Sequence, residues 1–390
     1  MQVVKSKELE QSFNGTNLRL ARCCYSLTLN DVAEAVEKSR QFIHRLEAGR
    51  DVPTSDLMER LAAFLGVFPE FFFGQAGIMV VEDAYHFRKK ATTKVASKQA
   101  ALAKGELFRR LVSHIDSHLQ LPPCSFPSFE VHVPEDIERA AEKCRLAWGL
   151  GLGPIDNIVR VAENAGAMVT TFHGVSHEVD AMSYASSRPV IVTNDAKGSS
   201  CRVRFDIAHE IGHVVMHEGR VTGDRLTESE ANRFGGAFLL PRSSFVKEFP
   251  ILRGSRLNWA GIGKLKLRWK VSKAAILYRA RQLDLISEDQ YKSGIIYGLR
   301  RNGEATVEEF DDVIPHEQPE LISTAFKMFE KAFGYELNEV AKQVGMTSRT
   351  LSQFLPESVF AKPEEVPAAT PSFAVYDMMH YRSRRELGTM

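Results

Sequence analysis

The sequence lacks the features that mark several large classes of protein. No apolar run approaches the roughly 20 residues of a membrane-spanning helix, and the N-terminal MQVVKSKELEQ has no signal-peptide core. The five cysteines form no CxxC pair, which excludes a cysteine-based zinc ribbon and argues against a disulfide framework. A GxxxxGK[ST] phosphate loop is also missing. We therefore expect a cytoplasmic protein that does not span a membrane and does not hydrolyse nucleotides.

An excess of charge of either sign is missing too. Lys and Arg total 50 against 49 Asp and Glu, which leaves a formal net charge of +1. Attraction to nucleic acid through bulk charge is thereby excluded, so any DNA contact must come from a local patch. A chain of 390 residues with 44% hydrophobic residues is instead typical of two to three packed domains.

Hydrophobic periodicity and breaks divide the chain into five segments. We expect a helical bundle at 15–75, a basic helical connector at 76–133, a mixed helix and strand domain at 134–290, a helical region at 291–356, and a flexible Pro-rich tail at 357–390. Within the connector, residues 88–110 carry eight positive charges against one negative charge. We expect this stretch to be exposed, which would make it one candidate site for self-cleavage between the two modules.

The segment from Thr28 to Gly49 has the pattern of a helix-turn-helix unit. A first helix is expected from Thr28, with small Ala33 at the crossing of two helices, a turn near Glu37, and a second helix capped by Ser39. Side chains on the outer face of the second helix, and one just beyond it, can donate hydrogen bonds to base edges or phosphates. They are Arg40, Gln41, His44, Arg45 and Arg50.

This pattern, together with the final helices around MERLAAFLGV, resembles the Xre/Cro-type helix-turn-helix family. The resemblance implies a double-stranded DNA operator with paired half-sites, and therefore a homodimer. Two positions depart from the family pattern: Glu37 stands where a turn glycine is usual, and Leu29 where a phosphate-contacting glutamine is common. A helical bundle that binds protein rather than DNA is the alternative.

The strongest chemical signal is the HExxH motif formed by His209, Glu210 and His213. Residues four apart lie on one face of a helix, so both imidazoles can bind one metal ion while Glu210 takes a proton from an activated water. Asp206 is expected to cap this helix at its start, and Gly219 to end it.

Such a site needs a third ligand, and three residues compete for the role. His217 lies eight residues after His209, roughly 12 Å along a helix, which predicts a supporting rather than a ligating histidine. Glu230 falls three residues after Thr227, a spacing typical of a capping box. Glu228 is therefore the predicted ligand, with Asn232 one turn later as a supporting hydrogen-bond partner.

Two histidines and one glutamate leave the fourth position of a zinc ion open, which is the arrangement of a catalytic site. Zinc would acidify water and polarise a peptide carbonyl, with Glu210 acting first as general base and then as general acid. A further donor must stabilise the oxyanion. Tyr184, His177 and Arg202 are candidates among which the sequence does not choose.

The run RVRFDIAHEIGHVVMH, followed by ESEANRFGGAFLLP and preceded by VDAMS and RPVIVTND, resembles the ImmA/IrrE family of zinc metallopeptidases. The resemblance covers about 134–290 and extends to the HFRKK element at 86–90. It implies a zincin-like α+β core with His209, His213 and Glu228 as zinc ligands and Glu210 as the catalytic residue. It also implies cytosolic cleavage of regulatory proteins, often repressors in stress responses or mobile elements.

The C-terminal third contains two further patterns. Residues 337–355 resemble a second helix-turn-helix, with Ala341, Gly345 and a helix capped by Thr347, but they hold few basic residues, which favours a packing or partner-binding helix pair. Residues 264–281 are rich in Lys and Arg and are either a DNA-facing patch or a solvated helix face.

The expected fold is thus an all-α helix-turn-helix bundle, an α+β zincin-like core and a mostly helical C-terminal region. The expected function is a DNA-tethered zinc endopeptidase that switches gene expression by cleaving a repressor, a partner or itself. Two alternatives stay open: a non-proteolytic regulator whose peptidase-like domain senses a metal or small ligand, and an antitoxin-like protein that holds a partner.

Overall fold

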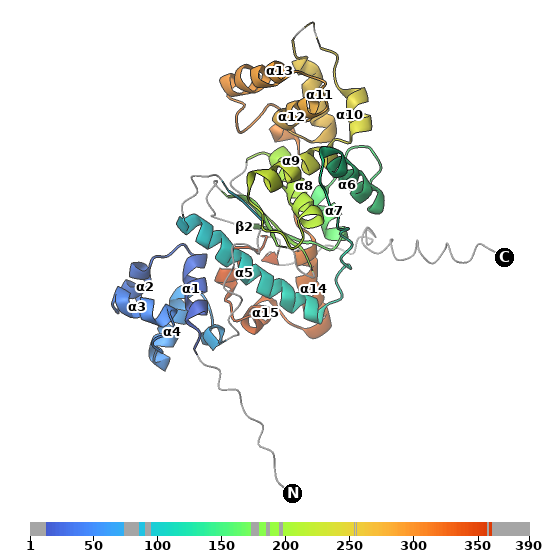
Figure 1. Ribbon diagram of the computed structural model, residues 1–390. Coiled ribbons are helices and arrows are strands. Elements are labelled where there is room, and N and C mark those ends of the chain that lie inside the picture. The colour runs from blue at the N-terminus through green and yellow to red at the C-terminus, as the bar shows by residue number, and fades with distance from the viewer. Residues whose placement is uncertain are drawn as a thin grey trace, which may run out of the picture. The chain divides into compact units, whose positions relative to one another are not determined.

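Helices dominate the computed structural model of the chain (Figure 1). The structure describes residues 13–73, 86–89, 95–172, 179–184, 188–194, 198–252, 254, 256–356 and 359–360. Within these ranges the expected fold class is confirmed: a helical N-terminal bundle, a central region of sheet and helices, and a helical C-terminal part. Nearly all of the expected flexible tail at 357–390 lies outside the described residues.

The N-terminal bundle is built from short helices whose starts are set by polar caps. It contains α1 (Gly15–Cys24), α2 (Leu29–Ala35), α3 (Arg40–Glu47), α4 (Ser55–Leu65) and a 3₁₀ turn, η1 (Pro69–Phe73). Ser39 caps α3 as the sequence predicts. Thr28, from which the first helix was expected to run, instead caps α2 in a capping box with Asp31. Ala33 is buried, and Glu37 adopts a left-handed φ of 54° in the turn between the two helices.

A four-stranded sheet lies at the centre of the described chain. Its order is β1 (His86–Lys89), β3 (Val179–Tyr184), β4 (Val190–Asn194), β2 (Met168–Phe172). The β2 and β4 strands are parallel, and the other neighbours are antiparallel. Because β1 pairs with β3, residues 86–89 belong to this sheet and not to the basic helix expected there.

Alternating side chains of the sheet enter two separate hydrophobic cores. Val169 and Ile191 belong to one core, whereas Met168, Val190 and Val192 belong to the other. The core that contains Val169 and Ile191 is here called the sheet-bundle core, and seven of the described α-helices contribute buried side chains to it. They are α6 (Pro134–Ala147), α7 (Ile158–Asn164), α8 (Ser200–Met216), α9 (Arg225–Leu239), α10 (Arg242–Glu248), α11 (Trp259–Trp269) and α12 (Lys273–Gln282).

Helix α5 (Val95–His118) corrects the prediction of an exposed connector. Every residue from Ala100 to Phe108 is buried, including Lys104 and Glu106. Glu106 accepts hydrogen bonds from both Arg109 and Arg110, which neutralises much of the local charge. The middle of α5 is buried on all sides because the helix packs against α1, β2 and β3 (Figure 1).

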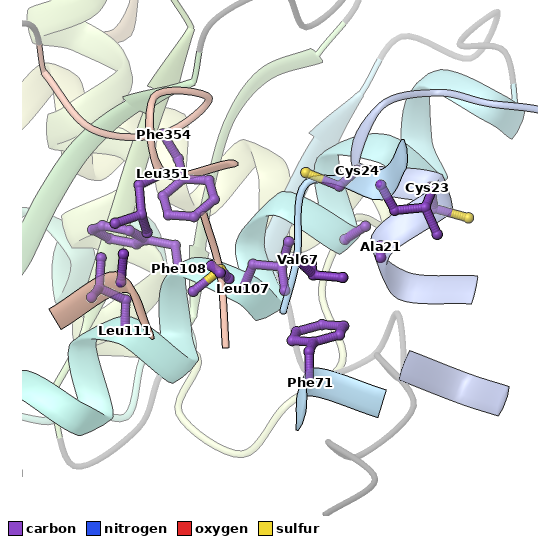
Figure 2. Packing of buried hydrophobic residues seen from close by; sticks show 14 of the residues in the cluster. Ala21, Cys23, Cys24, Val67, Phe71, Leu107, Phe108, Leu111, Leu351 and Phe354 are labelled. Atoms are coloured by element: carbon purple, nitrogen blue, oxygen red, sulfur yellow. The ribbon is translucent and has the colours of Figure 1, made fainter. Parts of the chain in front are cut away.

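The second core, here called the bundle–tail core, joins the N-terminal bundle to the C-terminal helices through α5. Figure 2 shows side chains of α5, including Phe108 and Leu111, beside Leu351 and Phe354, with Val67 and Phe71 of the bundle nearby. The C-terminal helices in this part of the chain are α14 (Leu321–Phe333), α15 (Leu337–Gln343) and α16 (Ser348–Leu351).

The helix pair α15–α16 docks on the end of α4, which supports a packing role over DNA reading. Thr347 does not cap α16 with its side chain as expected. Its hydroxyl and that of Thr350 donate instead to the carbonyl of Gly66, at 2.7 and 2.5 Å. The backbone N–H of Phe68 donates to the carbonyl of Gly345. These contacts hold the helix pair against the end of α4.

Between α12 and α14 the chain forms α13 (Glu288–Ser293), a π-helix (Gly294–Leu299) and 3₁₀ turns at Arg300–Asn302 and Asp311–Val313. Carboxylates of this region neutralise the basic stretch 264–281: Lys266 is buried against Glu308 and Asp311, and Lys273 pairs with Glu304. A DNA-facing patch on these side chains is therefore not supported. Among the described residues, no helix is both long and apolar enough to cross a membrane.

Candidate metal centre and DNA-binding face

The HExxH motif lies in the second half of helix α8, which is longer than the sequence indicated. The helix starts at Ser200, with Ser199 at the cap position, and ends at Met216. Asp206 is therefore not a cap; it is a buried residue inside the helix, and the prediction was wrong because apolar periodicity continues upstream of it. Gly219, with φ of 71°, lies in the turn after the helix end.

Close packing of α8 on α9 brings the two halves of the site together. A Cβ atom on Gly212 would lie 3.0 Å from the Phe234 ring, and one on Gly235 would lie 3.3 Å from the backbone nitrogen of His209. Real Cβ contacts are rarely this short, so the two glycines allow α8 and α9 to cross closely. The close approach places Glu228, on the first turn of α9, opposite the two histidines of α8.

His209, His213 and Glu228 converge on one point. The two Nε2 atoms are 3.0 Å apart, and each lies 3.4 Å from a different carboxylate oxygen of Glu228. In the part of the chain that the structure describes, these three residues form the only group of His, Cys, Asp and Glu with ligand atoms close enough to hold a metal ion.

The geometry of this group fits a zinc ion. Ligands about 2.0 Å from a tetrahedral centre are separated from each other by about 3.3 Å. The three separations of 3.0, 3.4 and 3.4 Å are close to that value. Both histidines are fully buried, whereas the Glu228 side chain is 22% exposed.

Each predicted ligand histidine has a hydrogen-bond partner on its other ring nitrogen. Nδ1 of His209 lies 3.1 Å from Oδ1 of Asn232, the amide expected to support the site. Nδ1 of His213 lies 2.9 Å from Nδ1 of His217. These contacts leave the Nε2 atoms of His209 and His213 directed at Glu228.

Glu230 has a different role from the capping box that the sequence suggested. Asp224 caps α9 and accepts from the backbone N–H groups of Leu226 and Thr227. The Glu230 carboxylate instead lies 2.8 Å from Nε2 of His217. Sequence spacing within α9 could not reveal this contact, because its partner follows the end of α8.

The pKa values of Glu228 and His217 are shifted by burial and by their neighbours. Burial acts to raise the pKa of Glu228, but contacts with His209 and His213 outweigh it and hold that pKa well below its ordinary value. Burial, followed by the neighbouring His213, lowers the pKa of His217. An ionised carboxylate is the form in which Glu228 can bind a divalent metal.

Glu210 is held by a partner that sequence reasoning missed. Its side chain is fully buried, and the hydroxyl of Ser183 on β3 donates to its Oε2 atom at 2.5 Å. Ser183 is part of the VDAMS run that contributed to the family resemblance, but nothing in its spacing marks it as a partner of Glu210.

The structure describes the side chain of one of the three candidate oxyanion donors. His177 and the side chain of Tyr184 lie outside the described residues. Arg202 donates a hydrogen bond to the backbone carbonyl of Ala305 and is thereby directed to another part of the chain.

Helix α3 (Arg40–Glu47) and the turn after it carry the residues that were predicted to contact DNA. Arg40, Gln41, His44, Arg45 and Arg50 are all exposed, while Ile43 and Leu46 on the opposite face are fully buried. Arg45 is the one member of this set with an ion pair among the described residues, 2.7 Å from Asp51. The outer face of α3 is therefore open and carries donors of the kind that bind base edges and phosphates.

Comparison with known families agrees with this two-part organisation. Residues 15–70 match the family model of a helix-turn-helix domain, and residues 161–281 match the peptidase M78 model, described as an IrrE N-terminal-like domain. Among curated proteins, none matches the chain. The chain is thus a fusion of a DNA-binding helix-turn-helix domain with an IrrE N-terminal-like domain, as the sequence predicts.

Proposed function

We propose that this chain is a transcriptional regulator that carries a zinc-dependent endopeptidase and switches gene expression by cleaving a regulatory protein. The convergence of His209, His213 and Glu228 beside a buried Glu210 carries the proposal. Binding of paired operator half-sites by a homodimer belongs to the same proposal and is supported by the match to a helix-turn-helix domain. A stress or mobile-element response is the setting that the resemblance to the ImmA/IrrE family implies.

The residues have separate tasks in the proposed reaction. Zinc held by His209, His213 and Glu228 would supply a Lewis acid that polarises a peptide carbonyl and acidifies water. Glu210 accepts the proton of the attacking water and then donates it to the leaving amine. The hydroxyl of Ser183 donates to Oε2 of Glu210 and thereby orients the carboxylate that exchanges the proton.

The substrate in this proposal is a separate protein. Self-cleavage within 95–110 would require a protease to reach a helix whose residues 100–108 are buried. A peptide must be extended and accessible to enter a peptidase site, so the folded α5 is a poor substrate. A repressor or partner protein with an exposed segment meets the requirement.

The appearance of new protein N-termini tests the proposed activity, whichever protein is the substrate. Cell extract is incubated with the zinc-loaded full chain or with its Glu210→Gln variant, and newly formed N-termini are identified by mass spectrometry. We expect a defined set that appears only with the unmodified chain. Identical sets with both proteins would contradict the proposal and favour a regulator that uses the domain as a sensor or partner-binding module.

A further inference from the structure

We infer that Glu230 is a positioning residue for the metal centre and acts on the ligand His213 through His217. This inference rests on the proposed function, since it assumes that His213 is a metal ligand. The contacts form a chain: His213 Nδ1 to His217 Nδ1 at 2.9 Å, and His217 Nε2 to Glu230 Oε2 at 2.8 Å.

The ring nitrogen that carries the proton in each histidine follows from the groups at the two ends of this series of hydrogen bonds. An ionised carboxylate only accepts hydrogen bonds, so His217 must carry its proton on Nε2 and direct it to Glu230. Nδ1 of His217 is then an acceptor, and the proton between the two rings must sit on Nδ1 of His213. Nε2 of His213 is thereby left with its lone pair, directed at the point it shares with His209 and Glu228.

Burial strengthens the hydrogen bonds that connect His213, His217 and Glu230. His213 and His217 are 1% and 0% exposed, and the Glu230 side chain is 11% exposed. Water therefore competes little for these hydrogen bonds, and a buried imidazole N–H without an acceptor would be costly. Without the carboxylate, His217 could take either tautomer, and the lone pair of His213 Nε2 would no longer be fixed.

The two ligand histidines are thus supported in different ways. His209 contacts the neutral amide of Asn232 directly, whereas His213 reaches a charged group through a second imidazole. The indirect route also connects the end of α8 to α9, because His217 follows the last residue of α8 and Glu230 lies on α9.

Zinc affinity of the full-length chain tests the positioning role. Zinc dissociation constants are measured by competition with a chromophoric chelator for the unmodified chain, Glu230→Leu, Glu230→Gln and the control Glu218→Gln. Glu218 is exposed and directly follows His217, so its variant removes one nearby charge without removing the contact. Thermal unfolding of the zinc-free proteins reports any loss of folding.

We expect Glu230→Leu to bind zinc about 10- to 100-fold more weakly than the unmodified chain, as is typical when a supporting carboxylate is lost. Glu230→Gln keeps an oxygen acceptor and should recover part of the affinity. Glu218→Gln should match the unmodified chain. Zinc affinity within twofold of the unmodified chain for folded Glu230→Leu, or for Glu230→Gln if Glu230→Leu does not fold, would overturn the inference.

The histidine tautomers provide a second readout that does not depend on metal. Long-range ¹H–¹⁵N spectra of the zinc-free chain should show His217 protonated on Nε2 only, and Glu230→Gln should weaken that preference. A His217 proton on Nδ1 in the unmodified chain would overturn the inference. Failure of the unmodified chain to bind zinc would contradict the proposed function instead, and the two failures are therefore distinguishable.

Discussion

Several single residues stand at positions where their type differs from what the local structure usually favours. Glu37 occupies a left-handed backbone position at which glycine is favoured, with φ of 54°. Gly212 and Gly235, in contrast, are glycines within helices, where they serve close helix packing and not turns. Residue type alone therefore does not show whether a position needs a left-handed backbone or close helix packing. The φ angle shows the first, and the neighbouring atoms show the second.

Replacement of Glu37 by glycine should stabilise the N-terminal bundle. The left-handed conformation costs an L-residue about 1–2 kcal/mol, and the greater entropy of glycine in the unfolded chain offsets part of the gain. The ion pair with Arg60 is long, at 3.7 Å, and exposed, so little is lost with it. We expect the free energy of unfolding to rise by up to about 1 kcal/mol, measured by urea denaturation.

The neighbouring Lys38→Gly variant is the matched control, because Lys38 has no left-handed φ. It should leave stability unchanged or lower it. Stabilisation by Lys38→Gly of the same size as by Glu37→Gly would contradict the account of backbone strain.

Whole elements are positioned by buried polar contacts at their ends as well as by apolar packing. The first residues of α14 are one case: the backbone N–H groups of Glu320 and Leu321 donate to the carboxylate of Glu163 on α7. Burial is the main cause that raises the pKa of Glu163 to about 7, against the opposing effect of these N–H groups.

The stability of the chain should therefore depend on the protonation of Glu163. The folded carboxyl holds its proton up to about pH 7, whereas in the unfolded chain it is lost near the ordinary value of 4.5. Between these values the folded state binds more protons, so this contribution to stability declines as pH rises. The free energy of unfolding of Glu163→Gln, relative to that of the unmodified chain, should therefore rise by up to about 3 kcal/mol from pH 5 to pH 8.

Urea unfolding across this pH range measures the difference, with Glu320→Gln as the control. Glu320 is about half exposed and pairs with Arg160 at the surface, so its variant should show no comparable pH dependence relative to the unmodified chain. If the difference in the free energy of unfolding between Glu163→Gln and the unmodified chain stays constant from pH 5 to pH 8, Glu163 does not titrate in this range.

Helix α3 is the element on which we predict DNA recognition to depend. Combined replacement of Arg40, Gln41 and His44 by alanine removes exposed donors without touching the buried face at Ile43 and Leu46. We expect loss of sequence-specific DNA binding with unchanged thermal stability, measured by selection from a random DNA library followed by fluorescence anisotropy. Retained sequence preference would refute the placement of the recognition helix.

At the scale of the whole molecule, the DNA-binding bundle is not an independent domain tethered by a flexible connector. Helix α5 and the helices α14–α16 share the bundle–tail core with the bundle, and Thr170 of β2 donates to the carbonyl of Phe354 at 2.5 Å. One face of the central sheet therefore contacts the same core that supports the helix-turn-helix unit.

A cavity in the C-terminal part of this core should destabilise the N-terminal bundle. Leu351→Ala removes a fully buried side chain, at an expected cost of about 2–5 kcal/mol. Hydrogen exchange should then become faster in α1–α4 as well as in α15–α16. Leu146→Ala, at a residue that is 81% exposed, is the control and should leave exchange unchanged. Faster exchange confined to 337–355 would show that the two parts are energetically separate.

The sequence predicted those features that depend on local spacing. The cap at Ser39 follows from its residue type, and the exposed donors of α3 and the pairing of His209 with His213 follow from helical periodicity. What it could not predict depends on contacts between distant segments. Burial of α5 arises from neighbours on several sides, and Glu230 is recognised as a partner of His217 only once α8 and α9 are packed together.

The central claim is a three-ligand zinc site, and metal content tests it most directly. Full-length unmodified chain, Glu228→Ala and Glu210→Gln are purified in parallel without added zinc, and bound metal is quantified by inductively coupled plasma mass spectrometry. We predict about one zinc per chain in the unmodified protein and in Glu210→Gln, with a sharp reduction in Glu228→Ala. No zinc in the unmodified chain, even after reloading, would contradict the claim.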